Sequence, residues 1–321
     1  MKRILRNLRP LAPVIDVFLS WLTFIGIIWF RIIKFWGPRY TPFSKWLFFK
    51  MGMIPVVKHY YEPFPDLEKI EEDYKYPRNL VSLDFNVKSQ LKFLDTFDFS
   101  DELSEIPFEA NNSYYFNNDS FGIGDAEAYY SIIRLLKPIN IIEIGGGFST
   151  KLAKISLNKN YDENLNYKYR LICIEPYEYK SIDDPGIELI KSRVEECSID
   201  IFYELDKNDI LFIDSSHIIK PGGDVLYEIF EILPILKSGV FVHFHDIFSP
   251  NYYPKRWLLD EMRLWNEQFL LEGFLSYNKQ FKIVLSMSYL MNSCRDKLNA
   301  LFPNLRKYPD VNPSSFWIRK V

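Results

Sequence analysis

The sequence is poor in the residues that build disulfide frameworks and cysteine-ligated metal sites. Its three cysteines, Cys173, Cys197 and Cys294, are odd in number and widely spaced, and no Cys-x-x-Cys pair occurs. This pattern excludes a disulfide scaffold and favours a reducing compartment. Internal repeats and low-complexity tracts are also missing. Because 48% of the residues are hydrophobic and 25% are charged, the chain is too apolar for intrinsic disorder and is expected to be globular.

Acidic residues are nearly absent from the first 61 residues, which contain ten Lys/Arg and only Asp16. The rest of the chain has 29 basic and 41 acidic residues and therefore a net charge of -12. A basic first segment on an acidic body indicates an anchor joined to a soluble domain. The acidic body offers no basic surface for nucleic acid, so we expect no nucleic-acid partner.

An uncharged run rich in aromatic and aliphatic residues fills positions 17–30. Its 14 residues are short for a membrane span of about 20, but residues 11–36 reach that length if Asp16 and Arg31 extend toward the interface. A second aromatic and basic patch follows at 46–54. We therefore predict that residues 1–61 form a hydrophobic helical anchor at the cytoplasmic face of a membrane, either spanning the bilayer or lying in its interface. The alternative is a buried or protein-docking helix.

Residues 62–104 begin with a proline- and acid-rich stretch and are predicted to be a linker and N-terminal extension, ahead of a domain over 105–321. From residue 125 onward, short apolar runs alternate with helical patterns, which predicts an α/β fold with a doubly wound, mostly parallel sheet. Strands are expected at 139–144, 171–174, 187–190, 210–213, 240–244, 281–289 and 315–319. Helices are expected at 125–137, 149–157, 224–236 and 255–276, with a loop at 158–168.

The most informative stretch is residues 141–150, IIEIGGGFST. Glycines after a strand let the backbone turn sharply and approach a ligand closely. Glu175 ends the next strand, where a carboxylate can bind both hydroxyls of a ribose. Glu143 within the first strand suits a cationic or amino-bearing ligand. A tight turn without a ligand is one alternative; a nicotinamide site is another, disfavoured because its fingerprint has a small residue where Thr150 stands.

This stretch resembles motif I of class I S-adenosylmethionine-dependent methyltransferases, and CIEPY, DILFIDSSH and VHFHDIFSP follow in the family's order. The similarity covers about residues 105–290. It implies a seven-stranded Rossmann-like sheet and S-adenosylmethionine as the cofactor. Gly145 and Gly147 would pass beneath the methionine part of the cofactor, Glu175 would bind its ribose, and the region around 194–195 would contact its adenine. The full cofactor set expected on this basis is Glu143, Gly145, Gly147, Ser149, Thr150, Glu175 and Asp125.

Asp125 belongs to FGIGDAE, residues 121–127, which is similar to a stretch that closes over the cofactor in relatives. An equal alternative is that Asp125 is only the N-cap of the following helix.

Three of the four histidines lie at or near the ends of two predicted strands, beside Asp214 and Asp246. His217 and His245 are predicted to be catalytic together with Asp214. His243 lies deeper in its strand, and we expect a hydrogen-bonded core residue there.

Asp214, His245 and Asp246 form a candidate site for Mg²⁺ or another divalent metal, because carboxylate and imidazole ligands suit such ions. Metal-dependent O-methyltransferases of the caffeoyl-CoA and macrocin types carry acidic ligands after the corresponding strands. His245 stands where those families usually have a carboxylate. The alternative needs no metal: His217 or His245 would act as a general base on a substrate hydroxyl.

These patterns together predict a methyltransferase that methylates an oxygen of a small-molecule, glycan or lipid-linked substrate at a membrane surface. Residues 249–254, Trp257 and Trp265 are predicted to form the substrate wall, with packing of the last helix on the sheet as the alternative. Two other functions stay open: a catalytically silent module that recruits partners to the membrane, and a nicotinamide-dependent oxidoreductase. The sequence also allows an oligomer.

Overall fold

The computed structural model describes residues 8–63, 65–110, 113–177, 182 and 184–321. The chain divides into two compact units, Met1–Asp73 and Tyr74–Val321. The predicted linker and extension, 62–104, is therefore shared between the two units. Its later part, with α5 (Val87–Leu94) and α6 (Ser100–Glu105), belongs to the second unit.

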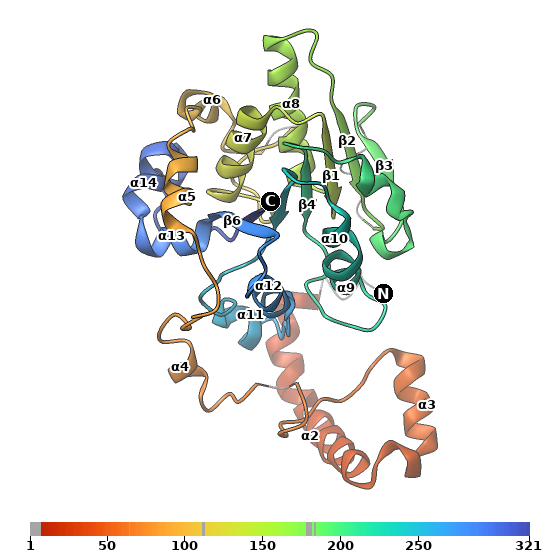
Figure 1. Ribbon diagram of the computed structural model, residues 1–321. Coiled ribbons are helices and arrows are strands. Elements are labelled where there is room, and N and C mark those ends of the chain that lie inside the picture. Colours follow the sequence, from red (N-terminus) through yellow and green to blue (C-terminus); the bar gives the residue numbers. More distant parts are fainter. Residues whose placement is uncertain (1–7, 64, 111–112, 178–181, 183) are drawn as a thin grey trace. The chain divides into compact units, whose positions relative to one another are not determined.

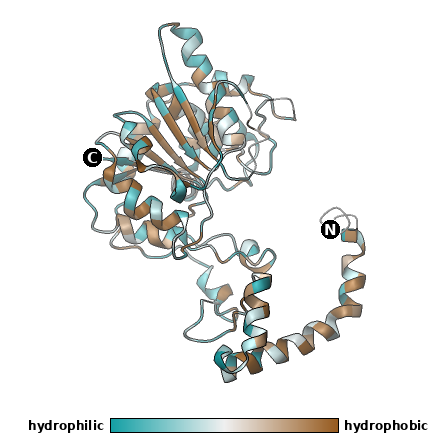
Figure 2. Ribbon diagram, turned by 90° about the vertical axis from the view of Figure 1, so that its right-hand side faces the viewer, coloured by the Kyte–Doolittle hydropathy of each residue, from teal (hydrophilic) through white to brown (hydrophobic). Residues whose placement is uncertain are grey.

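The first unit is helical. Its elements are η1 (Arg9–Leu11), α2 (Ala12–Trp36), η2 (Pro38–Tyr40), α3 (Pro42–Met51) and α4 (Ile70–Asp73). Gly37 and Gly52 follow α2 and α3 with positive φ angles of 89° and 67°, which suits glycine after a helix end. Hydrophobic residues run along α2 (Figure 2), and the stretch Arg9–Trp36 is long and apolar enough to cross a membrane. One such helix near the start of a chain is weak evidence for a membrane span.

The second unit is built on one sheet, which has seven strands over the described residues in the order β3-β2-β1-β4-β5-β7-β6 (Figure 1). The first five strands in this order pair in parallel, whereas β7 pairs antiparallel with both β5 and β6. This arrangement confirms the predicted doubly wound, mostly parallel fold. The strands are β1 (Asn140–Ile144), β2 (Arg170–Ile174), β3 (Glu188–Ile190), β4 (Ile210–Ile213), β5 (Phe241–Phe244), β6 (Phe281–Ser286) and β7 (Phe316–Lys320).

Helices cover both faces of this sheet, which explains why its central strands are short, continuous apolar runs. One face packs against α5, α6, α7 (Asp125–Leu136), α8 (Phe148–Glu163), α13 (Met287–Ser293), α14 (Arg295–Leu301) and α15 (Pro303–Lys307). The other face packs against η4 (Val194–Glu196), η5 (Ile199–Glu204), α9 (Asp224–Tyr227), the π-helical turn η6 (Glu228–Ile232), α10 (Leu233–Ile235) and α12 (Glu267–Leu275).

Three predicted elements differ from the structure. The helix expected over 255–276 is two helices, α11 (Lys255–Leu259) and α12, because tertiary hydrogen bonds hold the intervening backbone: Arg263 N donates to Trp257 O, and Asn266 N donates to His217 O. The strand expected over 281–289 ends at Ser286 and continues as α13, since a short apolar run does not distinguish strand from helix.

The polar insert expected as a loop over 158–168 is helical up to Glu163 in α8. Buried Asn160 explains this extension, because its amide donates to Ile133 O at 3.1 Å and its side chain also contacts Arg134 of α7. Polar residues here fix one helix against another rather than marking a solvated loop.

Candidate functional site

The carboxyl ends of β1, β2, β4 and β5 meet at one edge of the sheet. They place Gly145, Glu175, Asp214 and His245 there, each as the first residue after its strand. The ends of parallel strands at a change in strand order are the usual ligand crevice of such sheets. The structure therefore brings these four residues, which the sequence places after strands, to one edge of the sheet.

The three glycines of the loop differ in what a side chain at each position would meet. Gly145 has φ of 83°, and a Cβ there would lie 2.0 Å from the carbonyl oxygen of Asp214. A Cβ on Gly146 would lie 2.3 Å from Cys173 Sγ. Gly147 is extended, with φ of 172°, and a Cβ there would meet no atom within 4 Å. Gly145 and Gly146 are thus required by protein packing, whereas Gly147 borders open space.

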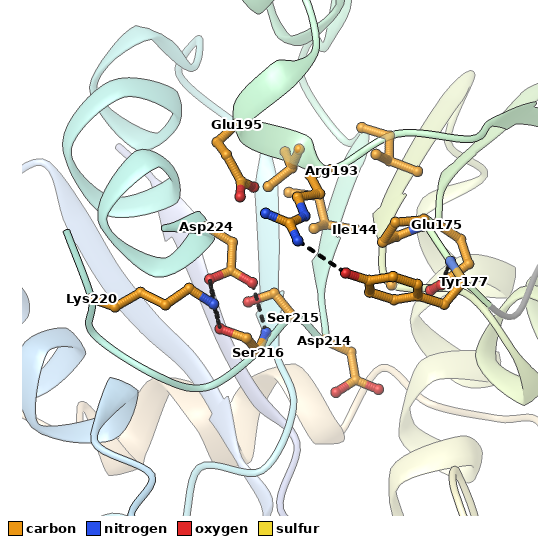
Figure 3. A pocket seen from close by; sticks show the side chains of 14 residues that line it. Ile144, Glu175, Tyr177, Arg193, Glu195, Asp214, Ser215, Ser216, Lys220 and Asp224 are labelled. Carbon is orange, nitrogen blue, oxygen red and sulfur yellow. Dashed lines mark hydrogen bonds and ion pairs between the residues drawn. The ribbon is translucent and has the colours of Figure 1, made fainter. Parts of the chain in front are cut away.

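A cavity of about 220 Å³ opens beside this loop (Figure 3). Glu175 is part of the cavity wall. Its Oε2 accepts a hydrogen bond from Gly146 N at 3.2 Å, and its Oε1 accepts one from Tyr177 N at 2.6 Å. These backbone bonds fix the carboxylate at the end of β2. The lining residues are Ile144, Gly145, Ile174, Glu175, Pro176, Tyr177, Arg193, Val194, Glu195, Asp214, Ser215, Ser216, Lys220 and Asp224; we call this the donor cavity.

Five predicted cofactor residues are outside the donor-cavity lining, and Gly147 is one of them. Glu143 is fully buried in β1, where Tyr129 Oη donates to Oε1 at 2.9 Å. Thr150 supports the glycine loop, because its Oγ1 accepts from Gly147 N at 3.1 Å, and Ser149 is buried beside it.

Asp125 is the fifth, and it lies toward a different group of residues. Its carboxylate accepts hydrogen bonds from Ser314 N at 2.9 Å and Ser315 N at 2.6 Å, and Oδ2 lies 3.6 Å from His245 Nε2. The N-cap alternative is wrong: Gly124 is the N-cap of α7, and Asp125 is the first helical residue.

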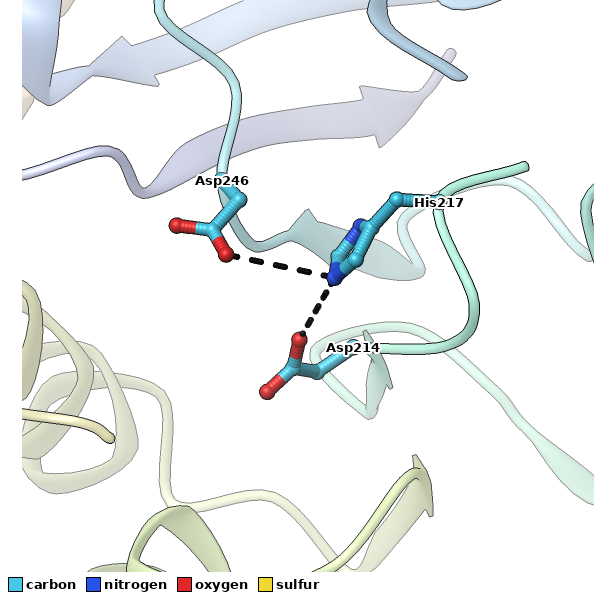
Figure 4. Close-up of side chains that lie close together, drawn as sticks. All are labelled: Asp214, His217 and Asp246. Carbon is cyan, nitrogen blue, oxygen red and sulfur yellow. Dashed lines mark ion pairs between the residues drawn. The ribbon is translucent and has the colours of Figure 1, made fainter. Parts of the chain in front are cut away.

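Asp214, His217, His245 and Asp246 gather at the ends of β4 and β5. His217 Nε2 lies 3.2 Å from Asp214 Oδ1 and 3.9 Å from Asp246 Oδ2 (Figure 4). His245 Nδ1 lies 3.5 Å from Asp214 Oδ1 and 3.7 Å from Asp246 Oδ2. Both imidazoles therefore face the same two carboxylates, and we call these four residues the polar cluster.

The geometry of the candidate metal ligands differs from the predicted trio of Asp214, His245 and Asp246. Within the part of the chain that the structure describes, the trio whose ligand atoms all lie within 4.8 Å of one another is Asp214, His217 and Asp246. His217 reaches this position because its backbone has a left-handed φ of 58°, which folds the turn after β4 back over the strand ends. A sequence pattern does not reveal such a turn, because histidine is uncommon in that conformation.

Comparison with known proteins bears on the crevice of β1, β2, β4 and β5. A family model described as a methyltransferase domain matches residues 142–247, the segment that supplies the glycine loop, Glu175 and the polar cluster. An uncharacterized protein of Archaeoglobus fulgidus is 30% identical over 177 residues, which cover 50% of this chain and 78% of the relative. The chain belongs to the class I S-adenosylmethionine-dependent methyltransferases.

Two solved methyltransferase structures are more distant. A Plasmodium falciparum protein described as a putative protein-L-isoaspartate O-methyltransferase, with S-adenosyl-L-homocysteine, is 12% identical, covers 49% of this chain and 75% of that one, and has a TM-score of 0.27. The plantazolicin methyltransferase BpumL, in complex with a pentazolic desmethylPZN analog and S-adenosylhomocysteine, is 16% identical. The match covers 79% of this chain and 99% of that one, with a TM-score of 0.36.

A second cavity of this methyltransferase, of about 360 Å³, opens above the polar cluster; we call it the acceptor cavity. Asp214 lines both cavities, so the two spaces meet at this carboxylate. Residues 249–254 lie behind the wall of the acceptor cavity, because buried Tyr253 packs edge-to-face against the lining residue Trp265, with ring centroids 6.1 Å apart. The lining residues are Asp119, Ser120, Asp214, His217, His245, Asp246, Arg256, Trp257, Glu261, Arg263 and Trp265.

The charges of the polar cluster depend on one another. Burial lowers the pKa of His217, but Asp214 and Glu267 outweigh burial and raise it to about 10. For His245, burial likewise lowers the pKa, and the charges of Asp246 and Asp214 more than reverse the effect. Burial would raise the pKa of Asp214, but the two imidazoles hold it well below its usual range. Without a cation, these shifts favour the imidazolium forms of His217 and His245 beside an ionised Asp214.

His243 is the buried core residue that the sequence predicts. Its Nε2 lies 2.9 Å from Ser315 Oγ, and its ring stacks on Phe212 with centroids 4.1 Å apart. Burial holds the pKa of His243 well below its usual value. This imidazole is neutral and serves packing.

Several lining residues were missed by sequence reasoning. In the donor cavity, Ser216 donates from Oγ to Asp224 Oδ1 at 2.6 Å, and Arg193 donates to Tyr177 Oη at 3.2 Å across the rim. Ser215 and Ser216 directly follow Asp214, so their position after a strand end was an available signal. Arg193 and Asp224 carried no signal, because both belong to turns whose direction only the fold defines.

Proposed function

We propose that this methyltransferase transfers the methyl group of S-adenosylmethionine to a hydroxyl oxygen of a small-molecule, glycan or lipid-linked acceptor at a membrane. The observation that carries this proposal is the shared wall at Asp214. A donor held along Glu175 and the glycine loop and an acceptor held over the polar cluster would meet there. Bringing two reactants into contact in a fixed orientation is the main contribution that a protein makes to such a displacement.

The reaction needs an acceptor oxygen that has lost its proton. As the oxygen attacks, the new O–C bond forms while the S–C bond of the sulfonium breaks, and S-adenosylhomocysteine leaves. His245 would take the proton of the hydroxyl in its neutral form, which a cation bound beside Asp214 and Asp246 favours because it offsets the carboxylate charges that His245 Nδ1 faces. Asp125 near its Nε2 stabilises the imidazolium that would result.

We further propose that Asp214, His217 and Asp246 hold a divalent cation such as Mg²⁺ or Mn²⁺. Two carboxylates and one imidazole match the ligand preference of these ions. The second nitrogen of His217, Nδ1, lies 2.8 Å from Glu267 Oε2, and a carboxylate behind a ligating histidine is the usual outer partner of such sites. A bound cation would lower the pKa of an acceptor hydroxyl.

The membrane setting is supported by the composition of the first unit. The helix α2 has apolar side chains along its length, and Arg31, Lys34, Lys45 and Lys50 add positive charge around α2 and α3. Such segments bind anionic lipid surfaces through apolar burial and electrostatic attraction. We therefore place the enzyme at the cytoplasmic face of a membrane.

Methyl transfer from labelled S-adenosylmethionine to a cell extract, with lipid and aqueous fractions separated afterwards, tests the proposal. Label is expected in the lipid fraction and should disappear when a chelator is added and return with Mg²⁺ or Mn²⁺. Asp246→Asn should abolish transfer while S-adenosylhomocysteine binding persists. Asp206→Asn, which changes an exposed carboxylate far from the cavities, is the matched control.

The acceptor, the cation and the methyl transfer are each contradicted by a different experimental result. Label confined to the aqueous fraction contradicts a lipid-linked acceptor. Full activity of a metal-free, chelator-treated enzyme contradicts the cation and leaves a histidine base. A protein that binds S-adenosylhomocysteine but labels nothing would be the silent module.

A further inference from the structure

We propose that Glu267 and Trp265 are positioning residues that hold the imidazole of His217 so that Nε2 faces Asp214 and Asp246. This inference rests on the cation site proposed above. Its starting point is the break between α11 and α12, where the sequence predicts an uninterrupted helix. The chain leaves the helical path at 260–266 and begins α12 at Glu267, beside the turn that carries His217.

The backbone of this segment is fastened to the His217 turn. Asn266 N and Glu267 N both donate to His217 O, at 3.0 and 3.2 Å. The side chain of Asn266 also contacts the turn that carries His217, because its Oδ1 accepts a hydrogen bond from Ile219 N at 2.7 Å. A non-glycine residue with positive φ is strained unless its surroundings hold it. These bonds are what hold His217 at its φ of 58°.

The side chains of the segment then fix the ring itself. Glu267 Oε2 lies 2.8 Å from His217 Nδ1, so Nδ1 keeps its hydrogen toward Glu267, and Nε2 is the nitrogen that would give up its proton to bind a cation together with the two carboxylates. Trp265 lies against the ring, with centroids 4.2 Å apart and planes inclined by 36°. The contact with Glu267 determines which nitrogen of His217 faces the polar cluster, and the contact with Trp265 limits rotation of the His217 ring.

A third layer supports Trp265 from outside. The guanidinium of Arg263 lies 4.6 Å from the Trp265 ring centroid and 4.9 Å from that of Trp257, and it pairs with Glu261 at 2.6 Å. The order outward from the candidate ligands is therefore His217, Trp265 and Arg263. The loop that breaks the predicted helix supplies two of these three layers.

Stability alone does not explain Glu267. Its side chain is 1% exposed, and within the described part of the chain its Oε1 has no hydrogen-bond partner. The neighbouring carboxyl of Glu228 is also buried and has an unpartnered Oε1 in the same described set. Burying carboxyl groups with unsatisfied oxygens costs free energy that an apolar side chain would avoid. Retaining one here is explained if it serves the orientation of His217.

Mn²⁺ binding to the full-length protein in detergent, saturated with S-adenosylhomocysteine, tests the inference. Titration calorimetry should give affinities in the order wild type, Glu267→Gln, Glu267→Ala, with a total loss of about 10- to 100-fold, the usual effect of removing an outer partner of a ligating histidine. Trp265→Phe should lose less than Trp265→Ala. S-adenosylhomocysteine affinity should stay at the wild-type value in every variant.

Two further measurements separate positioning from a general loss of structure. Glu272→Gln removes another buried carboxylate of α12, which pairs with Arg78 and touches no residue of the polar cluster, so it should leave Mn²⁺ affinity unchanged. Electron spin-echo modulation of bound Mn²⁺ should show one imidazole nitrogen in the wild type, a weakened signal in Glu267→Ala, and none in His217→Ala.

The outcomes distinguish this inference from the proposed function. If Glu267→Ala binds Mn²⁺ as tightly as Glu272→Gln, with an unchanged nitrogen signal, the positioning role is refuted while the cation site stands. If the wild type binds no Mn²⁺ but still transfers methyl groups, the cation and the positioning role both fall while the methyltransferase function stands. Should Glu267→Ala not fold, Glu267→Gln and Trp265→Phe still decide the question.

Discussion

Replacing Glu143 with glutamine should make the stability of the second unit less dependent on pH. The side chain is fully buried in β1. Burial is the largest influence on its carboxyl group and raises its pKa to about 8, against the opposing effect of the Thr150 and Tyr129 hydroxyls. In the unfolded chain the same group ionises near its ordinary value of 4.5. The folded protein therefore keeps a proton that the unfolded chain loses.

The sign and the size follow from this difference. Because the folded-state pKa is raised, the contribution of Glu143 to stability is fully present below about pH 4.5 and is lost as the pH rises toward 8. The difference of about 3.5 pKa units corresponds to roughly 5 kcal/mol, lost at about 1.3 kcal/mol per pH unit near neutrality. Glutamine has the shape of the neutral carboxyl group and does not ionise, so Glu143→Gln should remove this loss.

Urea unfolding at pH 6, 7 and 8, followed by near-ultraviolet circular dichroism, measures the effect. The free energy of unfolding of Glu143→Gln relative to wild type should rise by about 2–3 kcal/mol from pH 6 to pH 8. Burial also raises the pKa of Glu127, to about 7, but that residue is present in both proteins and its effect cancels. Parallel pH dependences, or a variant that is several kcal/mol less stable at pH 6, would show that Glu143 is ionised in the fold and refute the reasoning.

Two other predictions concern the donor cavity and the anchor. Gly147→Val should fold like the wild type, since a Cβ there meets no protein atom within 4 Å, yet bind S-adenosylhomocysteine at least about tenfold more weakly by calorimetry; normal affinity would place the cofactor away from this loop. The full-length protein should bind vesicles containing anionic lipid in preference to neutral ones. High salt should weaken an interfacial mode but not extract a spanning helix, and failure to bind either vesicle would refute the anchor.

Elements that depend on local pattern were predictable from the sequence, and elements that depend on distant partners were not. The seven strands of the described residues lie near their predicted positions, because each is a short run rich in apolar residues. The strand ends also located Glu175, Asp214 and Asp246. The break at 260–266 was missed because the apolar spacing there is helical, while the hydrogen bonds that break it come from His217, more than 40 residues earlier.

The same distinction applies inside the site. Choosing between His217 and His245 as the third member of a carboxylate trio requires the φ angle of one residue, which no spacing rule supplies. Asp125 was assigned toward the cofactor because FGIGDAE resembles a stretch that closes over the cofactor in relatives. Nothing in the sequence indicated that its carboxylate accepts hydrogen bonds from the backbone amides of Ser314 and Ser315, which lie nearly 190 residues along the chain. Glu267 gave no signal, because it lies in the middle of the helix predicted over 255–276, where a glutamate is an ordinary helix former.

The position of β7 between β5 and β6 has a consequence for synthesis of the chain on the ribosome. Asp246 and Asp125 both bond to Ser314, and β5 has β7 as its neighbour on one side. At ordinary rates of about 5–20 residues per second, translation from Asp246 to the end of β7 takes roughly 4–15 seconds. During that interval β5 is an open edge, and unpaired edges are where chains associate wrongly. We therefore expect a chaperone, or the unfinished chain itself, to cover the open edge of β5 until β7 emerges.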